Sequence, residues 1–146
     1  MSRGLGWVQQ ACFEAICKRE ATKKDLWPTT YTIAADIYQV KPDKDGNRWI
    51  ADAQHVAVKR ALEGLQRKGR IIGFRDLLQA RTPGIDGHGE LAHIWMTEAG
   101  LARWLQARAE VARTTLNPAL RVVVIQKARE IAKRAESLGL TVNWAR

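Results

Sequence analysis

Basic side chains are concentrated in the middle of the chain. Between Gln54 and Arg81, seven residues are basic and only two are acidic, whereas the whole chain of 146 residues has 24 basic and 15 acidic residues. Guanidinium, ammonium and amide groups donate hydrogen bonds to phosphate oxygens and to the edges of nucleic-acid bases. This focused charge, in a chain of net charge +9, points to a polyanionic partner, either nucleic acid or an anionic membrane surface.

Many of these polar side chains share one face of a predicted helix. Apolar periodicity predicts a helix over residues 53–68, with Asp52 as its N-cap. Val58, Leu62 and Leu65 recur at helical spacing, and we expect this aliphatic stripe to be buried. The opposite face then presents five polar or charged side chains to solvent: Gln54, His55, Lys59, Arg60 and Arg67.

A helix of this kind fits the major groove of duplex DNA, where Arg and Lys can read guanine and Gln can read adenine. Residues near its N-terminus lie closest to the base edges, which selects Gln54, His55, Lys59 and Arg60. Phosphate contacts are expected further along the chain, from Arg67, Lys68 and Arg70. Two more cations flank a predicted loop and could meet the backbone or the minor groove: Arg75 and Arg81. The alternative is a solvated basic helix face, but the order of the surrounding elements favours DNA.

The elements that must position this helix begin on its N-terminal side. Helical spacing predicts a first helix over about residues 5–19. Thr29 is a suitable N-cap for a short second helix, Tyr31–Tyr38. A loop of eleven residues, 41–51, rich in proline, glycine, aspartate and asparagine, then leads into the helix over 53–68.

On the C-terminal side, residues 70–75 and 91–96 are predicted to be the strands of a hairpin with a long tip. Thr97 is expected to cap a fourth helix, and a fifth is expected over about residues 119–138. The fifth carries an apolar seam with spacings of four, three, four and three: Val124, Ala128, Ile131, Ala135 and Leu138. Such a seam either packs back on the chain or forms a homodimer, and we favour the dimer.

Three segments in this order resemble parts of winged helix-turn-helix proteins. Residues 58–72, Val-Lys-Arg-Ala-Leu-Glu-Gly-Leu-Gln-Arg-Lys-Gly-Arg-Ile-Ile, resemble the recognition helix and first wing strand of that family. Residues 29–34 look like its second helix, and residues 95–101 resemble its exit from the wing. The resemblance covers about residues 5–105. It implies a mainly α fold with a small β-hairpin wing and an additional C-terminal helix, and double-stranded DNA as the partner.

The resemblance also implies domain boundaries and a function. Residues 1–116 are expected to form the DNA-binding domain, and residues 117–146 a C-terminal helix that could serve in dimerisation. The expected function is sequence-selective DNA binding by a transcriptional regulator, with the helix over 53–68 in the major groove. Thr29 and Thr30, which open the second helix, join the candidate DNA-binding residues. A winged-helix protein–protein interaction module, or a replication or partition protein of a mobile element, are the alternatives.

The loop over residues 41–51 is longer than the usual turn of the resembled family. It could contact DNA through Lys44 and Arg48, or it could act as a spacer. It also resembles an EF-hand calcium loop, whose first ligand positions are occupied by Asp43, Asp45 and Asn47. However, Arg48 replaces the glycine of the sharp turn and Gln54 replaces the bidentate glutamate, so we expect no calcium site.

Catalytic chemistry is not indicated by the sequence. It contains no nucleophile elbow, phosphate-binding glycine loop or zinc-protease pattern, so we expect no enzyme activity, no metal and no cofactor. Cys12 and Cys17 lie about 140° apart on a helix and cannot easily share a bond or a metal. The sequence has neither a long apolar run nor a signal-peptide pattern, and we expect a cytoplasmic protein without membrane contact.

Overall fold

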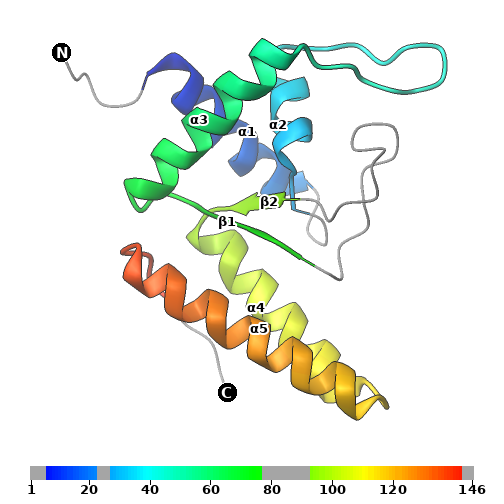
Figure 1. Ribbon diagram of the computed structural model, residues 1–146, viewed down its shortest axis with the longest axis vertical. Helices are drawn as coiled ribbons and strands as arrows, with labels where there is room; N and C mark the ends of the chain where they lie inside the picture. Colours follow the sequence, from blue (N-terminus) through cyan, green and yellow to red (C-terminus); the bar gives the residue numbers. More distant parts are fainter. Residues whose placement is uncertain (1–5, 23–26, 77–92, 143–146) are drawn as a thin grey trace.

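Five helices and a two-stranded hairpin make up the described part of the chain (Figure 1). The structure is a computed structural model, and it describes residues 6–22, 27–76 and 93–142. The elements in chain order are α1 (Trp7–Thr22), α2 (Thr30–Ile37), α3 (Asp52–Arg67), β1 (Ile72–Arg75), β2 (His93–Met96), α4 (Glu98–Thr114) and α5 (Pro118–Ser137). The expected mainly α fold with a small β-hairpin is confirmed.

Helix α1 extends to Thr22, through polar residues that the sequence pattern places after its end. The reason is a long-range contact of Glu20, which is only 6% exposed. Its carboxylate accepts hydrogen bonds from the backbone N–H of Thr97 at 2.7 Å and from the Thr97 hydroxyl at 2.5 Å. The last turn of α1 is therefore tied to the N-cap of α4.

The predicted helix caps are confirmed at two of three positions. The hydroxyls of Thr29 and Thr97 accept backbone N–H groups in the first turns of α2 and α4. The prediction for α3 is wrong by one residue, since Ala51 and not Asp52 is its N-cap. There the side chain of Gln54 accepts the N–H of Ala51 at 3.1 Å. Asp52 lies in the first turn instead, where its negative charge interacts favourably with the positive end of the helix dipole.

The hairpin separates two apolar clusters because its side chains alternate between its faces. Ile72 and Phe74 of β1, with Ile94 and Met96 of β2, pack in one cluster with α4 and α5. Trp95 points the other way and packs with residues of α1, α2 and α3. Each half of the molecule therefore buries its core against one face of the same small sheet.

The segment before α2 adds a third short stretch to this sheet. The carbonyl of Pro28 accepts the backbone N–H of Trp95 at 3.0 Å, and Thr29 forms a bridge with Ile94. The indole N–H of Trp95 also donates to the hydroxyl of Thr30 at 2.9 Å. The start of α2 is thus anchored directly to β2, which fixes the orientation of α2 against the hairpin.

A glycine is required at the centre of β1. Gly73 pairs with Trp95 across the hairpin, and a Cβ at this position would overlap the Trp95 ring. We expect Gly73→Ala to destabilise the protein by about 1–3 kcal/mol, because an added methyl group must displace a buried indole. Urea unfolding would measure this loss. Gly6→Ala is the control, since a Cβ there meets nothing within 4 Å, and equal midpoints for the two variants would refute the overlap.

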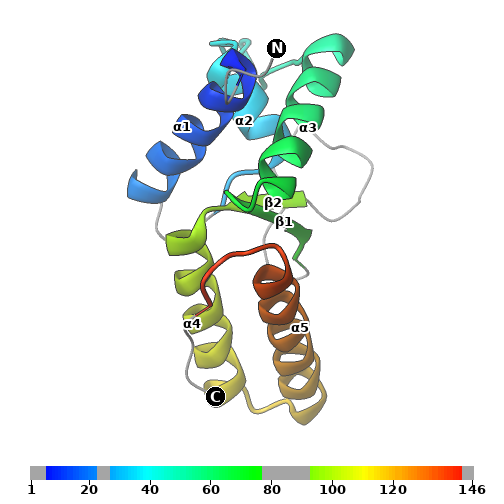
Figure 2. The same cartoon turned by 90° about the vertical axis from the view of Figure 1, so that its left-hand side faces the viewer.

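Helix α5 packs along α4 beneath the hairpin, as Figure 2 shows. The residues of its heptad seam from Val124 to Ala135 are at most 4% exposed. Ala128, Ile131 and Ala135 belong to the cluster shared with α4 and the sheet. Arg134 fixes the last turns of α5 to the rest of the chain, donating to the carbonyl of Gly73 at 2.8 Å and to the side chain of Gln66 at 2.9 Å. The seam therefore packs on its own chain, and the structure gives no support for the expected homodimer through it.

Candidate nucleic-acid interface

Helix α3 lies across α1 and α2 and presents one long face to solvent (Figures 1 and 2). Its predicted stripe of Val58, Leu62 and Leu65 is fully buried against these two helices. Ala61 also belongs to the buried side, with 7% of its surface exposed. Because an α-helix turns by about 100° per residue, this stripe fixes which α3 side chains point outward.

The cations of α3 lie on the outward face. Lys59, Arg60 and Arg67 are exposed, and none of them forms an ion pair with any residue that the structure describes. Their charges are therefore not neutralised within the described fold. Glu63, an exposed carboxylate on the same face, has no such partner either and could accept a hydrogen bond from cytosine.

Gln54 and His55 are half-buried rather than fully exposed. The Gln54 carboxamide oxygen caps Ala51, while the His55 ring stacks on Tyr31 of α2 with centroids 4.5 Å apart. Burial and the nearby Lys59 charge lower the pKa of His55 below its ordinary value, so the ring is neutral at pH 7. Both side chains are thus positioned at the start of α3, and His55 contributes hydrogen-bonding capacity without charge.

The remaining predicted cations extend this face from the end of α3 to β1. Lys68, Arg70 and Arg75 are all exposed. Lys68 donates to Gln9 at 3.0 Å, and the Arg70 guanidinium lies 4.7 Å from the centre of the Phe13 ring. The charged groups of both residues therefore contact side chains of α1, while the residues as a whole stay exposed. Arg81 lies outside the described residues.

Thr29 and Thr30 do not join this surface, although the sequence analysis included them. They are 6% and 8% exposed. The Thr29 hydroxyl caps α2, and the Thr30 hydroxyl accepts the indole N–H of Trp95. Both hydroxyls are used inside the fold, so neither is offered to a ligand.

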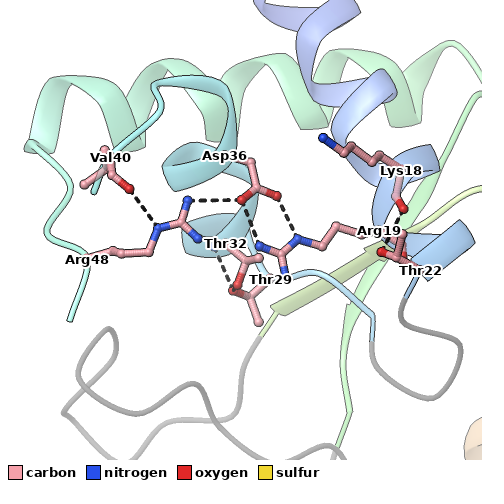
Figure 3. Close-up of polar contacts among 8 residues, drawn as sticks. All are labelled: Lys18, Arg19, Thr22, Thr29, Thr32, Asp36, Val40 and Arg48. Carbon is pink, nitrogen blue, oxygen red and sulfur yellow. Dashed lines mark hydrogen bonds and ion pairs between the residues drawn. The ribbon is translucent and has the colours of Figure 1, made fainter. Parts of the chain in front are cut away.

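The loop before α3 is held to α1 and α2 by a shared carboxylate (Figure 3). Asp36 accepts two hydrogen bonds from Arg19, at 2.7 and 2.8 Å, and one from Arg48 at 3.1 Å. Burial alone would raise the pKa of Asp36, but the two guanidinium groups outweigh it and lower that pKa below its ordinary value. Arg48 also donates to the carbonyl of Val40 at 3.1 Å. Arg48 is thus a structural anchor. Of the two loop residues expected as possible DNA contacts, Lys44 and Arg48, only Lys44 is exposed.

In the part of this loop that resembles an EF-hand, the first aspartate, Asp43, holds the backbone in a turn through hydrogen bonds. One carboxylate oxygen of Asp43 accepts the N–H groups of Asp45 and Asn47, and the other accepts the indole N–H of Trp49 at 2.8 Å. Trp49 and the two backbone groups lower the pKa of Asp43. Within residues 6–22, 27–76 and 93–142, no three His, Cys, Asp or Glu side chains are grouped as metal ligands.

Arg134 of α5 lies near this surface, and local sequence does not indicate that it does. His93 of β2 is half-buried and stacks on Trp95. Burial lowers its pKa, and so do the positive charges of Arg75, Arg134 and Lys59, which come from β1, α5 and α3. Arg75 lies opposite His93 in the hairpin, and Arg134 reaches the carbonyl of Gly73 in β1. Arg134 was missed because it approaches α3 and β1 only through tertiary packing of α5.

The two cysteines differ in environment. Cys12 is fully buried in α1, and burial raises the pKa of its thiol to about 12. Cys17 is exposed, and desolvation together with Glu20 raises its pKa as well. Both side chains are therefore protonated thiols at neutral pH.

No protein-family model matches the chain, and searches of curated proteins and of solved structures give no match either. Within the described residues, no helix combines the length and apolar character needed to cross a membrane. A functional interpretation therefore depends on the geometry of the surface formed by α3 and β1.

Proposed function

We propose that this chain binds duplex DNA as a winged helix-turn-helix protein, with α3 in the major groove, and that it regulates transcription. The observation that carries the proposal is that α3 has a buried aliphatic face and, opposite it, an exposed cationic face. A fully buried aliphatic stripe fixes the helix, and the outward face carries Lys59, Arg60 and Arg67 without described counter-ions. Glu63 shares this face, but the three cations leave it with a net positive charge, which suits a polyanion.

The positions of the cations favour a division of roles along this surface. Lys59 and Arg60 lie in the middle of α3, one turn after His55, and in this proposal they contact base edges. Arg67, Lys68 and Arg70 follow at the end of the helix, where phosphate contact is the simpler role. Arg75 marks the point where β1 leads towards the tip of the hairpin, and it would place the wing against the backbone.

The affinity for duplex DNA should depend steeply on salt. Each phosphate contact contributes about 0.9 to the slope of the logarithm of the binding constant against the logarithm of salt concentration. If half or more of the six exposed cations named above contact phosphates, the slope is about −3 or steeper. Fluorescence anisotropy with duplexes from a selected and a random pool would measure it. Absence of binding to both pools at low salt would refute the proposal.

A second candidate function is association with another protein, and exposed apolar side chains at one end of the α4–α5 pair favour it. Leu116 is 98% exposed, and Val122 and Val123 are 53% and 44% exposed. This function would leave DNA affinity low and insensitive to changes in α3. The salt titration therefore discriminates between the two candidates.

A further inference from the structure

An apolar side chain lies among the charges on the outward face of α3. Val56 is 44% exposed, and in α3, every residue of which the structure describes, it is the one large apolar side chain in that state. Val56 lies about 160° around the helix axis from Val58, the centre of the buried stripe. It therefore points away from the core and contributes little to the packing of α3.

Valine at position 56 is unfavourable for the stability of α3 itself. A β-branched side chain at an exposed helix position loses rotamer freedom and has lower helix propensity than alanine. A contact with a ligand outside the described fold would offset this cost. Val56 is also in the second turn of α3, in the part of a recognition helix that approaches base edges most closely.

The neighbours of Val56 indicate what kind of group it would meet. Arg60 follows one turn later on the same face, so the Cβ atoms of the two residues are about 5–6 Å apart. Lys59 lies beside them and is exposed as well. If these cations read acceptors on guanine, the apolar group that the major groove displays within reach of Val56 is the C5-methyl group of thymine.

We propose that Val56 is a specificity-determining residue that contacts the methyl group of a thymine in the major groove. This inference rests on the proposed DNA-binding function, and it names one base that the site would select. The contact is a van der Waals and hydrophobic one, so it discriminates thymine from bases that lack the methyl group without adding charge. The selected thymine would lie within about two base steps of a base read by Arg60, because one helical turn of the protein spans 5.4 Å.

The experiment uses the full chain and a duplex enriched from a random pool. Each thymine of that duplex is replaced in turn by deoxyuridine, which differs only in lacking the C5-methyl group. For the unaltered protein, one replacement should lower affinity about fourfold, the effect of one buried methyl group. Val56→Ala should bind the thymine and deoxyuridine duplexes equally at that position. The matched control, Val122→Ala, removes the same atoms from an exposed site on α5 and should keep the fourfold discrimination.

The outcomes separate this inference from the proposed function. If a sequence is enriched but Val56→Ala still discriminates fully between the thymine and deoxyuridine duplexes, the role of Val56 is overturned. The proposed DNA binding is then unaffected. The same holds if no thymine replacement affects the unaltered protein. Failure to enrich any sequence overturns the proposed sequence-selective function, and the role of Val56 with it. Because alanine is the better helix former, loss of folding is not expected in Val56→Ala, and circular dichroism checks this.

Discussion

Asp76→Ala is expected to lower the free energy of unfolding by about 3–5 kcal/mol, the usual cost of removing one partner of a buried ion pair. Asp76 directly follows β1 and is only 2% exposed. Its carboxylate pairs with Arg108, which is 9% exposed, and accepts the indole N–H of Trp104 at 2.8 Å. Without the carboxylate, a guanidinium that is almost fully buried loses its counter-ion, and the Trp104 N–H loses its acceptor.

Chemical denaturation followed by circular dichroism would measure this loss. The control Asp45→Ala removes an exposed carboxylate from the loop before α3 and should shift stability by less than about 0.5 kcal/mol. Adding Arg108→Met to Asp76→Ala should recover part of the loss, because the unpaired buried charge is then gone as well. An Asp76→Ala protein as stable as the Asp45→Ala control would show that the pair does not support the junction of β1 with α4.

The Asp76–Arg108 pair also shows where prediction from sequence stops. In α4, Leu101, Trp104 and Leu105 recur at helical spacing and are buried, whereas Ala109, which continues the same spacing, is exposed. Arg108 is buried instead. A charged side chain is not expected inside a fold unless its partner is known, and Asp76 is 32 residues away in the sequence. Local periodicity holds no information about such a partner.

Predictions were most accurate where the cause is local. Thr29 and Thr97 cap α2 and α4 because a hydroxyl reaches the N–H of a residue three positions later. Gly69 follows the end of α3 with φ of +72°, which glycine adopts without strain. By contrast, the seam of α5 has the same pattern whether it packs on its own chain or on another copy. Only the position of α4 decides that question.

The same division applies to the candidate interface. The outward cations of α3 follow from its periodicity, because the positions of Val58, Leu62 and Leu65 determine the opposite face. The role of Arg48 does not follow from local sequence, because it depends on Asp36 and α1. Nor does the burial of Thr30, which depends on a hydrogen bond to Trp95 from the far strand of the hairpin. Sequence therefore predicts which side chains a helix presents, whereas tertiary contacts determine which of them stay free to bind.

The double variant Lys59→Ala/Arg60→Ala is expected to lower affinity for a selected duplex by at least about 30-fold. A good base contact in the major groove contributes about 1–3 kcal/mol, and the variant removes two candidates for such contacts. Affinity for random duplexes should fall less, because the phosphate contacts of Arg67, Lys68 and Arg70 remain. The stability of the fold should hardly change, since both side chains are exposed and have no ion pair with a described residue.

The decisive comparison is with Arg129→Ala/Lys133→Ala, which removes two exposed cations from α5 and so changes the net charge by the same amount. These residues lie about 140° and 100° around the α5 axis from Arg134, which contacts β1 and α3, so they are turned away from the proposed interface. Anisotropy titrations at one salt concentration should show a large loss for the α3 variant and a small one for the α5 variant. Equal losses would mean that net charge alone attracts DNA, and α3 would then have no special role in recognition. A loss confined to the α3 variant would instead attribute sequence selection to α3, whose buried stripe determines which of its side chains point outward.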